Sequence, residues 1–149
     1  MYYKINLFIW KFPRLFVSLQ CQNIRSDYPG RIPRGQDYID SMQVALERVV
    51  SQGLGRKAGT PFLQVAGKTG TAQLDEYDYY NEAGVPLSGY HLSFCGYFPA
   101  NAPKYSMIVS LNKMGLPASG GGMAGVLFHD ILEWMIFHDM LPLVSQEKE

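Results

Sequence analysis

The sequence predicts an α+β fold in which an antiparallel sheet is flanked by helices. Three observations favour it: helical apolar spacing before residue 53, two extended apolar runs at 91–98 and 105–111, and a second helical pattern from residue 123. The expected order is helix, three antiparallel strands, helix, which lets two helices cover one face of the sheet. A chain of 149 residues is long enough for one such domain.

The first helix is expected after a loop over residues 22–36, which are rich in Pro, Gly, Asn and Ser. Apolar side chains then recur at helical spacing, at Met42, Leu46, Val49 and Val50. Asp37 or Asp40 is available to cap the start, and Gly53 should end the helix.

The strands are expected to begin at residues 62–66, which lead directly into residues 67–71. Residues 75–90 are polar and tyrosine-rich and predict a loop. Proline on both sides of the 99–103 connection predicts a hairpin between the next two runs. Cys95 lies in the apolar run and is expected to be a buried structural thiol.

The last helix is expected after the glycine run at 120–122. Its predicted core face comprises Met123, Leu127, Ile131, Trp134 and Met135. The sequence thus divides into residues 1–36, which remain unassigned, a domain over 37–140, and a polar tail over 141–149.

Composition excludes some classes of protein. Thirteen basic residues balance thirteen acidic ones, so no basic stripe recruits nucleic acid. The apolar residues near the N-terminus are interrupted by Lys11, Pro13 and Arg14, so neither a membrane span nor a signal peptide is expected there. Cys21 and Cys95 lack metal-ligand spacing.

The segment that carries chemistry is Lys68-Thr69-Gly70-Thr71, or KTGT. A nucleotide-binding phosphate loop would need glycine at position 62, where this chain has Phe62. A lysine at an exposed strand end instead offers positive charge to a substrate carboxylate, and neighbouring threonine hydroxyls can hydrogen-bond that carboxylate. Gly70 lets a substrate backbone approach the strand as a further strand would.

Residues 65–73, VAGKTGTAQ, closely resemble the segment around this motif in class B penicillin-binding proteins. Residues 49–55, 94–106 and 121–128 resemble the family's preceding helix end, following hairpin and glycine-rich entry to the last helix, in the same order. The resemblance runs from about residue 38 to 137 and favours the septal, division-type branch.

The resemblance implies peptidoglycan D,D-transpeptidase ancestry, with a D-Ala-D-Ala stem peptide or a β-lactam as partner. It implies carboxylate recognition by Lys68, Thr69 and Thr71, close approach at Gly70, and an oxyanion-hole role for the Thr71 backbone N–H. It also implies the extracytoplasmic face of the bacterial inner membrane. No cofactor or metal is expected.

The family uses a serine in an S-x-x-K motif and a second S-x-N motif, both before KTG. The S-x-x-K in this chain is Ser110-Leu111-Asn112-Lys113, which follows KTGT and lies in a predicted strand. Positions i and i+3 of a strand point to opposite faces, so Lys113 should not activate Ser110. We therefore assign no catalytic residue, and expect a C-terminal transpeptidase portion that labelled penicillin does not acylate alone.

Two interpretations stay open: a transpeptidase portion, or a non-catalytic peptide- or protein-interaction module derived from that fold. Apolar surfaces that the other half of a transpeptidase domain would cover should drive association. We therefore expect a homo-oligomer, or a partner chain that supplies that half. His91 begins a strand and is assigned to edge packing more readily than to substrate contact. His129 and His138 fall on opposite sides of the last helix and should not share a metal.

Overall fold

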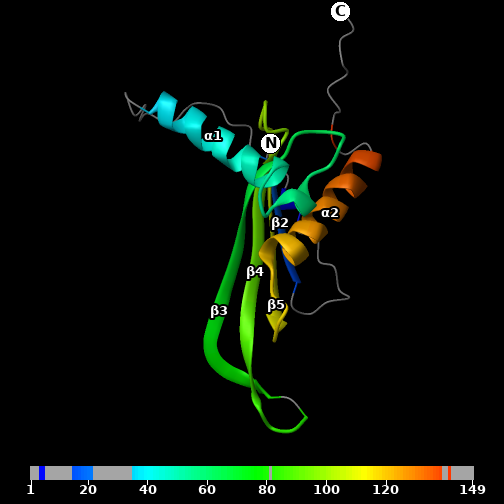
Figure 1. Cartoon of the computed structure of the whole chain (residues 1–149). Helices are drawn as coiled ribbons and strands as arrows, with labels where there is room; N and C mark the ends of the chain where they lie inside the picture. The colour runs from blue at the N-terminus through cyan, green and yellow to red at the C-terminus, as the bar shows by residue number, and fades with distance from the viewer. Residues whose placement is uncertain (1–3, 6–14, 22–34, 81, 139–140, 142–149) are drawn as a thin grey trace, which may run out of the picture.

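The computed structural model describes residues 4–5, 15–21, 35–80, 82–138 and 141 (Figure 1). The loop expected over 22–34 and the tail beyond residue 141 lie outside these residues. The strands are β1 (Lys4–Ile5), β2 (Leu15–Cys21), β3 (Ala66–Tyr80), β4 (Pro86–Phe98) and β5 (Tyr105–Met114). The α-helices are α1 (Gln36–Ser51) and α2 (Gly125–Phe137), with short helical turns η1 (Arg56–Ala58) and η2 (Gly120–Ala124).

The strands form one antiparallel sheet in the order β1-β2-β5-β4-β3. The α+β prediction is therefore confirmed, and β2 adds a strand from residues that the sequence left unassigned, paired with β5. This order places β3, which carries KTGT, at one edge of the sheet.

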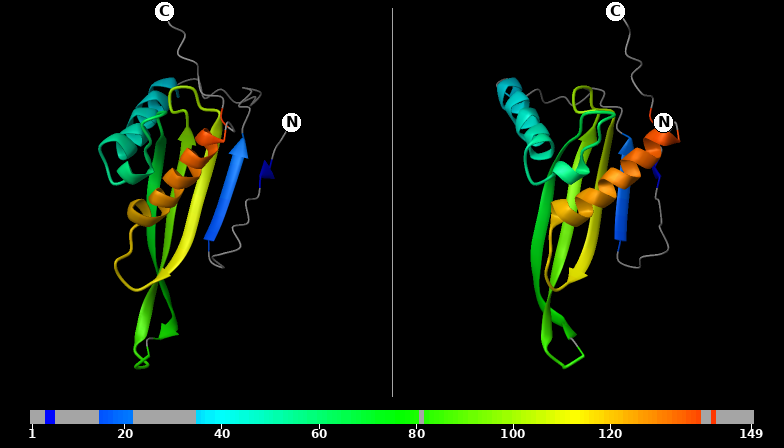
Figure 2. Two further views of the ribbon diagram at one scale, coloured as in Figure 1. Left: turned by 90° about the vertical axis from the view of Figure 1, so that its right-hand side faces the viewer. Right: turned by 45° about the vertical axis from the view of Figure 1, so that its right-hand side comes forward.

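One face of the sheet, the core face, carries Leu92, Phe94 and Phe98 and is crossed by α2 (Figure 2). The Phe128 ring of α2 packs edge-on against Phe94, at 4.7 Å between centroids, and against Phe98, at 5.9 Å. Such aromatic pairs add to the free energy gained from burying apolar area.

A glycine pair makes room for these rings. Gly67 lies opposite Gly96 across β3 and β4. A Cβ on Gly67 would lie 2.7 Å from the Phe94 ring, and one on Gly96 would lie 3.0 Å from the Phe128 ring. The first glycine of the GKTGT segment therefore serves aromatic packing rather than phosphate binding.

The predicted core face of the last helix is correct for Met135 and wrong for Trp134, while Leu127 and Ile131 are partly buried against the core. The buried residues of α2 are Gly125, Phe128, Leu132, Met135 and Ile136, whereas Trp134 is 47% exposed. Apolar residues occur on several sides of this helix, so spacing alone did not identify the side that meets the sheet.

The predicted loop over residues 75–90 is also wrong, because β3 continues to Tyr80 and β4 begins at Pro86. A register shift between Leu74 and Tyr79 marks a bulge in this long hairpin. Tyrosine favours strands, and cross-strand pairing outweighs the polarity of the segment.

Strand alternation corrects the prediction for Cys95, which is exposed rather than buried. Its neighbours Phe94 and Gly96 point to the core face, so Cys95 points to the opposite side. We call that side the open face, because His91, Cys95 and Asn112 on it are exposed.

Helix α1 ends as predicted but starts differently. Its N-cap is Gly35, without a side-chain cap, and Asp37 lies in the first turn. Val50, near its end, joins the core, while Figure 1 shows α1 at one end of the sheet. The prediction that both helices lie across one face is therefore correct for α2 and wrong for most of α1.

Candidate functional site

The KTGT segment lies on the edge strand β3, where successive side chains point to opposite faces. Lys68 pairs with Cys95 and belongs to the open face, where it is exposed. Thr69 pairs with Phe94 and Thr71 with Leu92, so both threonines belong to the core face. The Lys68 Nζ donates to the Thr69 carbonyl oxygen at 2.9 Å. The motif thus presents its ammonium group and its hydroxyls on different sides of one strand.

The glycine-rich turn η2 holds the threonine side of this strand. The Gly120 N–H donates to Thr71 Oγ1 at 2.9 Å, and this bond joins segments far apart in the chain. A Cβ on Gly120 would collide with the Gly70 carbonyl oxygen and lie 2.8 Å from that of Ser93. A Cβ on Gly121 would collide with the Leu54 carbonyl oxygen.

Gly70 is itself confined from within the sheet. A Cβ there would collide with Ser93 Oγ on β4. A side chain at Gly70 would therefore have to displace the Ser93 hydroxyl, in addition to covering the open strand edge that the sequence predicted there. Sequence reasoning noted the glycine run at 120–122 but missed its contact with KTGT.

Ser110 lies in β5, as predicted, and its hydroxyl bonds to His91 Nε2 at 2.8 Å. Lys113 Nζ instead donates to the carbonyl oxygens of Met114, at 3.1 Å, and Gly115, at 3.0 Å. His91 also bonds to Asn112 Oδ1, at 2.7 Å through Nδ1. Lys113 is therefore engaged away from Ser110, and the network around His91 is one that sequence reasoning missed.

The other two histidines have structural partners. His129 Nδ1 bonds to the Gly59 carbonyl oxygen at 2.9 Å, and its Nε2 lies 3.5 Å from Glu133. His138 follows α2, bonds to the Trp134 carbonyl oxygen at 2.8 Å and stacks on the Trp134 ring. No cluster of three or more His, Cys, Asp or Glu that could hold a metal ion occurs in the described part of the chain.

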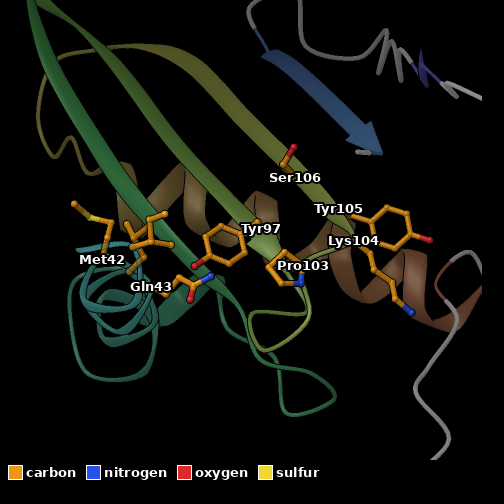
Figure 3. Close-up of a pocket in the computed structure, with 9 residues that line it drawn as sticks. Met42, Gln43, Tyr97, Pro103, Lys104, Tyr105 and Ser106 are labelled. Atoms are coloured by element: carbon orange, nitrogen blue, oxygen red, sulfur yellow. The ribbon is translucent and has the colours of Figure 1, made fainter. Parts of the chain in front are cut away.

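An apolar pocket of about 370 Å³ lies between α1 and the β4–β5 end of the sheet (Figure 3). It is lined by Ile39, Met42, Gln43, Leu46, Tyr97, Pro103, Lys104, Tyr105 and Ser106. The Tyr97 hydroxyl is buried and has no hydrogen-bond partner among the described residues. Burial, with a smaller contribution from the negative charge of Glu47, raises the pKa of Tyr97 above its ordinary value of 10.0.

None of the described helices is long and apolar enough to cross a membrane.

Comparison with known proteins identifies the fold and the family. The model of the penicillin-binding protein transpeptidase domain matches residues 12–133. Penicillin-binding protein PbpB of Mycolicibacterium smegmatis is 34% identical over 99 residues, which cover 63% of this chain and 14% of that protein. Stage V sporulation protein D of Bacillus subtilis is 35% identical over 92 residues, or 61% of this chain and 14% of that protein.

Solved structures agree. The transpeptidase domain of FtsI4 D,D-transpeptidase from Legionella pneumophila aligns with a TM-score of 0.53 at 27% identity, over 65% of this chain and 34% of that one. Penicillin-binding protein 3 from Mycobacterium tuberculosis, complexed with ampicillin, aligns with a TM-score of 0.51 at 29% identity. This alignment covers 76% of this chain and 26% of that one. The chain thus spans about a seventh of these curated relatives and about a third of the solved transpeptidase domain.

The matched region contains the KTGT strand, the hairpin and the last helix on which the sequence resemblance rested, and the resemblance to class B penicillin-binding proteins is confirmed. This chain therefore belongs to the penicillin-binding protein transpeptidase domain family.

Proposed function

We propose that this chain forms the KTGT side of a peptidoglycan D,D-transpeptidase site. In this role Lys68, Thr69, Gly70 and Thr71 recognise the terminal carboxylate of a D-Ala-D-Ala stem peptide, or the equivalent group of a β-lactam. The observation that carries the proposal is an edge strand whose Lys68 is exposed and whose Thr71 hydroxyl is positioned by the Gly120 N–H.

The chemistry assigned to these residues follows from their donors. The Lys68 ammonium supplies positive charge and N–H donors to a carboxylate, and charge-assisted bonds of this kind are stronger than neutral ones. Thr71 Oγ1 already accepts a hydrogen bond from Gly120, so its own O–H is oriented to donate to the ligand. The Thr71 backbone N–H is proposed as one donor of the oxyanion hole.

Acyl transfer also needs a serine nucleophile next to a base, and we propose that Ser110 is not that nucleophile. Its hydroxyl bonds to His91 on the open face, whereas Thr69 and Thr71 face the other side of the sheet. Lys113, the lysine of the same S-x-x-K, donates to the carbonyl oxygens of Met114 and Gly115 rather than to Ser110. The serine of the S-x-x-K motif is then supplied by other polypeptide, either further sequence or a partner chain, at the extracytoplasmic site where peptidoglycan is cross-linked.

A chimera tests this function. Residues 36–138 would replace the matching segment of the L. pneumophila transpeptidase domain, which supplies the missing motifs. We expect fluorescent penicillin to label the chimera covalently but not the isolated chain. Lys68→Ala should slow labelling roughly 10–100-fold, which corresponds to the loss of a hydrogen bond to a charged group.

Lys104→Ala is the matched control, because Lys104 is an exposed lysine on the β4–β5 connection. A folded chimera that labels equally fast with Lys68 and with Ala at that position would refute the carboxylate-binding role. The unsubstituted chimera also separates the alternative interpretation, because a non-catalytic interaction module would leave it folded yet unlabelled.

A further inference from the structure

The open face carries a hydrogen-bonded relay of three side chains, which we call the Ser-His-Asn relay: Ser110, His91 and Asn112. Ser110 Oγ lies 2.8 Å from His91 Nε2, and His91 Nδ1 lies 2.7 Å from Asn112 Oδ1. The register explains the assembly, because His91 pairs directly with Asn112 across β4 and β5, and Ser110 lies two residues away on the same face.

These contacts fit one tautomer of a neutral His91 ring. An amide oxygen only accepts hydrogen bonds, so the bond to Asn112 Oδ1 requires the proton of the neutral imidazole on Nδ1. The lone pair of Nε2 then accepts the Ser110 hydroxyl proton. A serine nucleophile is activated when its hydroxyl donates a hydrogen bond to a base and a third group orients that base.

The surroundings of Ser110 indicate what could react there. Ser93 lies directly across from Ser110 on the same face, and its hydroxyl is turned toward Gly70 on β3, away from Ser110. Ile108, two residues before Ser110, is 37% exposed and pairs with the exposed Cys95. Ser110 itself is only 8% exposed, so a reactant that reaches its hydroxyl must be small.

From this geometry we propose that Ser110 is an activated nucleophile toward small carboxylic esters, with His91 as its general base and Asn112 as the residue that positions His91. Ser110 Oγ bonds to the acyl carbon while its proton passes to His91 Nε2. The ester C–O bond then breaks, and the leaving alkoxide takes that proton and departs as the alcohol. Water hydrolyses the acyl-serine by the reverse proton path, releasing the carboxylic acid and restoring Ser110.

This reaction is independent of the transpeptidase role proposed above. The threonines of KTGT lie on the core face and take no part in it.

An alkyl fluorophosphonate probe tests the proposal on the full chain. Attack by Ser110 Oγ forms an O–P bond, breaks P–F, and sends the proton to His91 Nε2, so one adduct per chain is expected. Peptide mass mapping should place it on Ser110. Hydrolysis of p-nitrophenyl acetate, followed by p-nitrophenolate release, gives a second measurement.

Variants of the relay test whether His91 and Asn112 activate the Ser110 hydroxyl. His91→Phe should slow labelling about 100-fold or more, as loss of a general base does. Asn112→Ala should slow it as well, and Asn112→Asp should restore it, because a carboxylate also accepts from Nδ1–H. Ser106→Ala is the matched control on the same face of β5, and Cys95→Ala removes background reaction at the exposed thiol; both should label like the native chain.

Labelling of the native chain tests the proposal for Ser110 even if a variant fails to fold. No adduct on Ser110 in the folded native protein, or an adduct on other residues alone, would overturn the proposal. An unchanged labelling rate in folded His91→Phe, checked by circular dichroism, would overturn it equally.

Discussion

Replacing Gly120 by alanine tests whether the glycine-rich turn holds the KTGT strand. The added methyl group would meet the carbonyl oxygens of both Gly70 and Ser93, which are backbone atoms that cannot rotate away. Overpacking of this kind costs about 1–3 kcal/mol. Displacement of the turn would also break the bond from the Gly120 N–H to Thr71 Oγ1, at roughly 0.5–1.5 kcal/mol. The expected loss in free energy of unfolding is therefore about 1.5–4.5 kcal/mol.

Gly125→Ala is the matched control. Gly125 begins α2 with helical backbone angles, and its nearest Cβ contact would be 3.6 Å from Ala58, an ordinary van der Waals distance. Alanine favours a helix over glycine, so this variant should be more stable by about 0.5–1 kcal/mol. The two substitutions add the same methyl group five positions apart, and they should change the free energy of unfolding in opposite directions.

Urea unfolding followed by far-ultraviolet circular dichroism measures both effects. Thr71→Val isolates the hydrogen bond, because it removes the acceptor without adding a methyl group to the turn, and should cost roughly 0.5–1.5 kcal/mol. If Gly120→Ala unfolded at the same urea concentration as the native chain, with an unchanged slope, the contact between η2 and β3 would not be as described.

Two further predictions concern the pocket and the surface. Tyr97→Phe removes a buried hydroxyl without a partner among the described residues and should leave stability equal or higher. Because burial, and secondarily Glu47, raises the pKa of Tyr97 in the folded state, the folded chain holds this proton more tightly than the unfolded chain. The native chain should therefore lose stability relative to Tyr97→Phe as pH rises above about 10, and thermal unfolding at pH 8 and pH 10.5 measures the difference; parallel losses in both proteins would contradict it. The second prediction is self-association: Tyr38, Ile39 and Met42 on α1 are 78%, 51% and 59% exposed, and light scattering should find a dimer or larger species, whereas a stable monomer would refute this.

The sequence predicted the parts of the fold that depend on local patterns. The first helix, the strand that carries KTGT, the hairpin after residue 91 and the last helix each have a period or a boundary residue that reveals them. Errors arose where tertiary contacts decide. Residues 75–80 belong to a strand because β3 continues to pair with β4 there. Cys95 faces outward because Phe94 and Phe98 occupy the core face.

The candidate site divides in the same way. KTGT is contiguous, so its chemistry could be proposed from four residues. The Gly120–Thr71 bond and the Ser-His-Asn relay depend on which residues the antiparallel register places opposite one another, and no local pattern encodes that register. The glycine run was a visible signal of close approach, but its partner was not visible.

The division of KTGT between two faces has a consequence for how the protein can evolve. The core-face side is constrained by backbone contacts, since a Cβ on Gly120 would collide with the Gly70 carbonyl oxygen and would lie 2.8 Å from that of Ser93. The open-face side is built from side chains at the surface, such as His91 and Asn112, whose replacement leaves the buried rings untouched. Inherited changes can therefore accumulate on the open face while the other face is kept nearly unchanged. One sheet can therefore keep the contacts of one face while the side chains of its other face change.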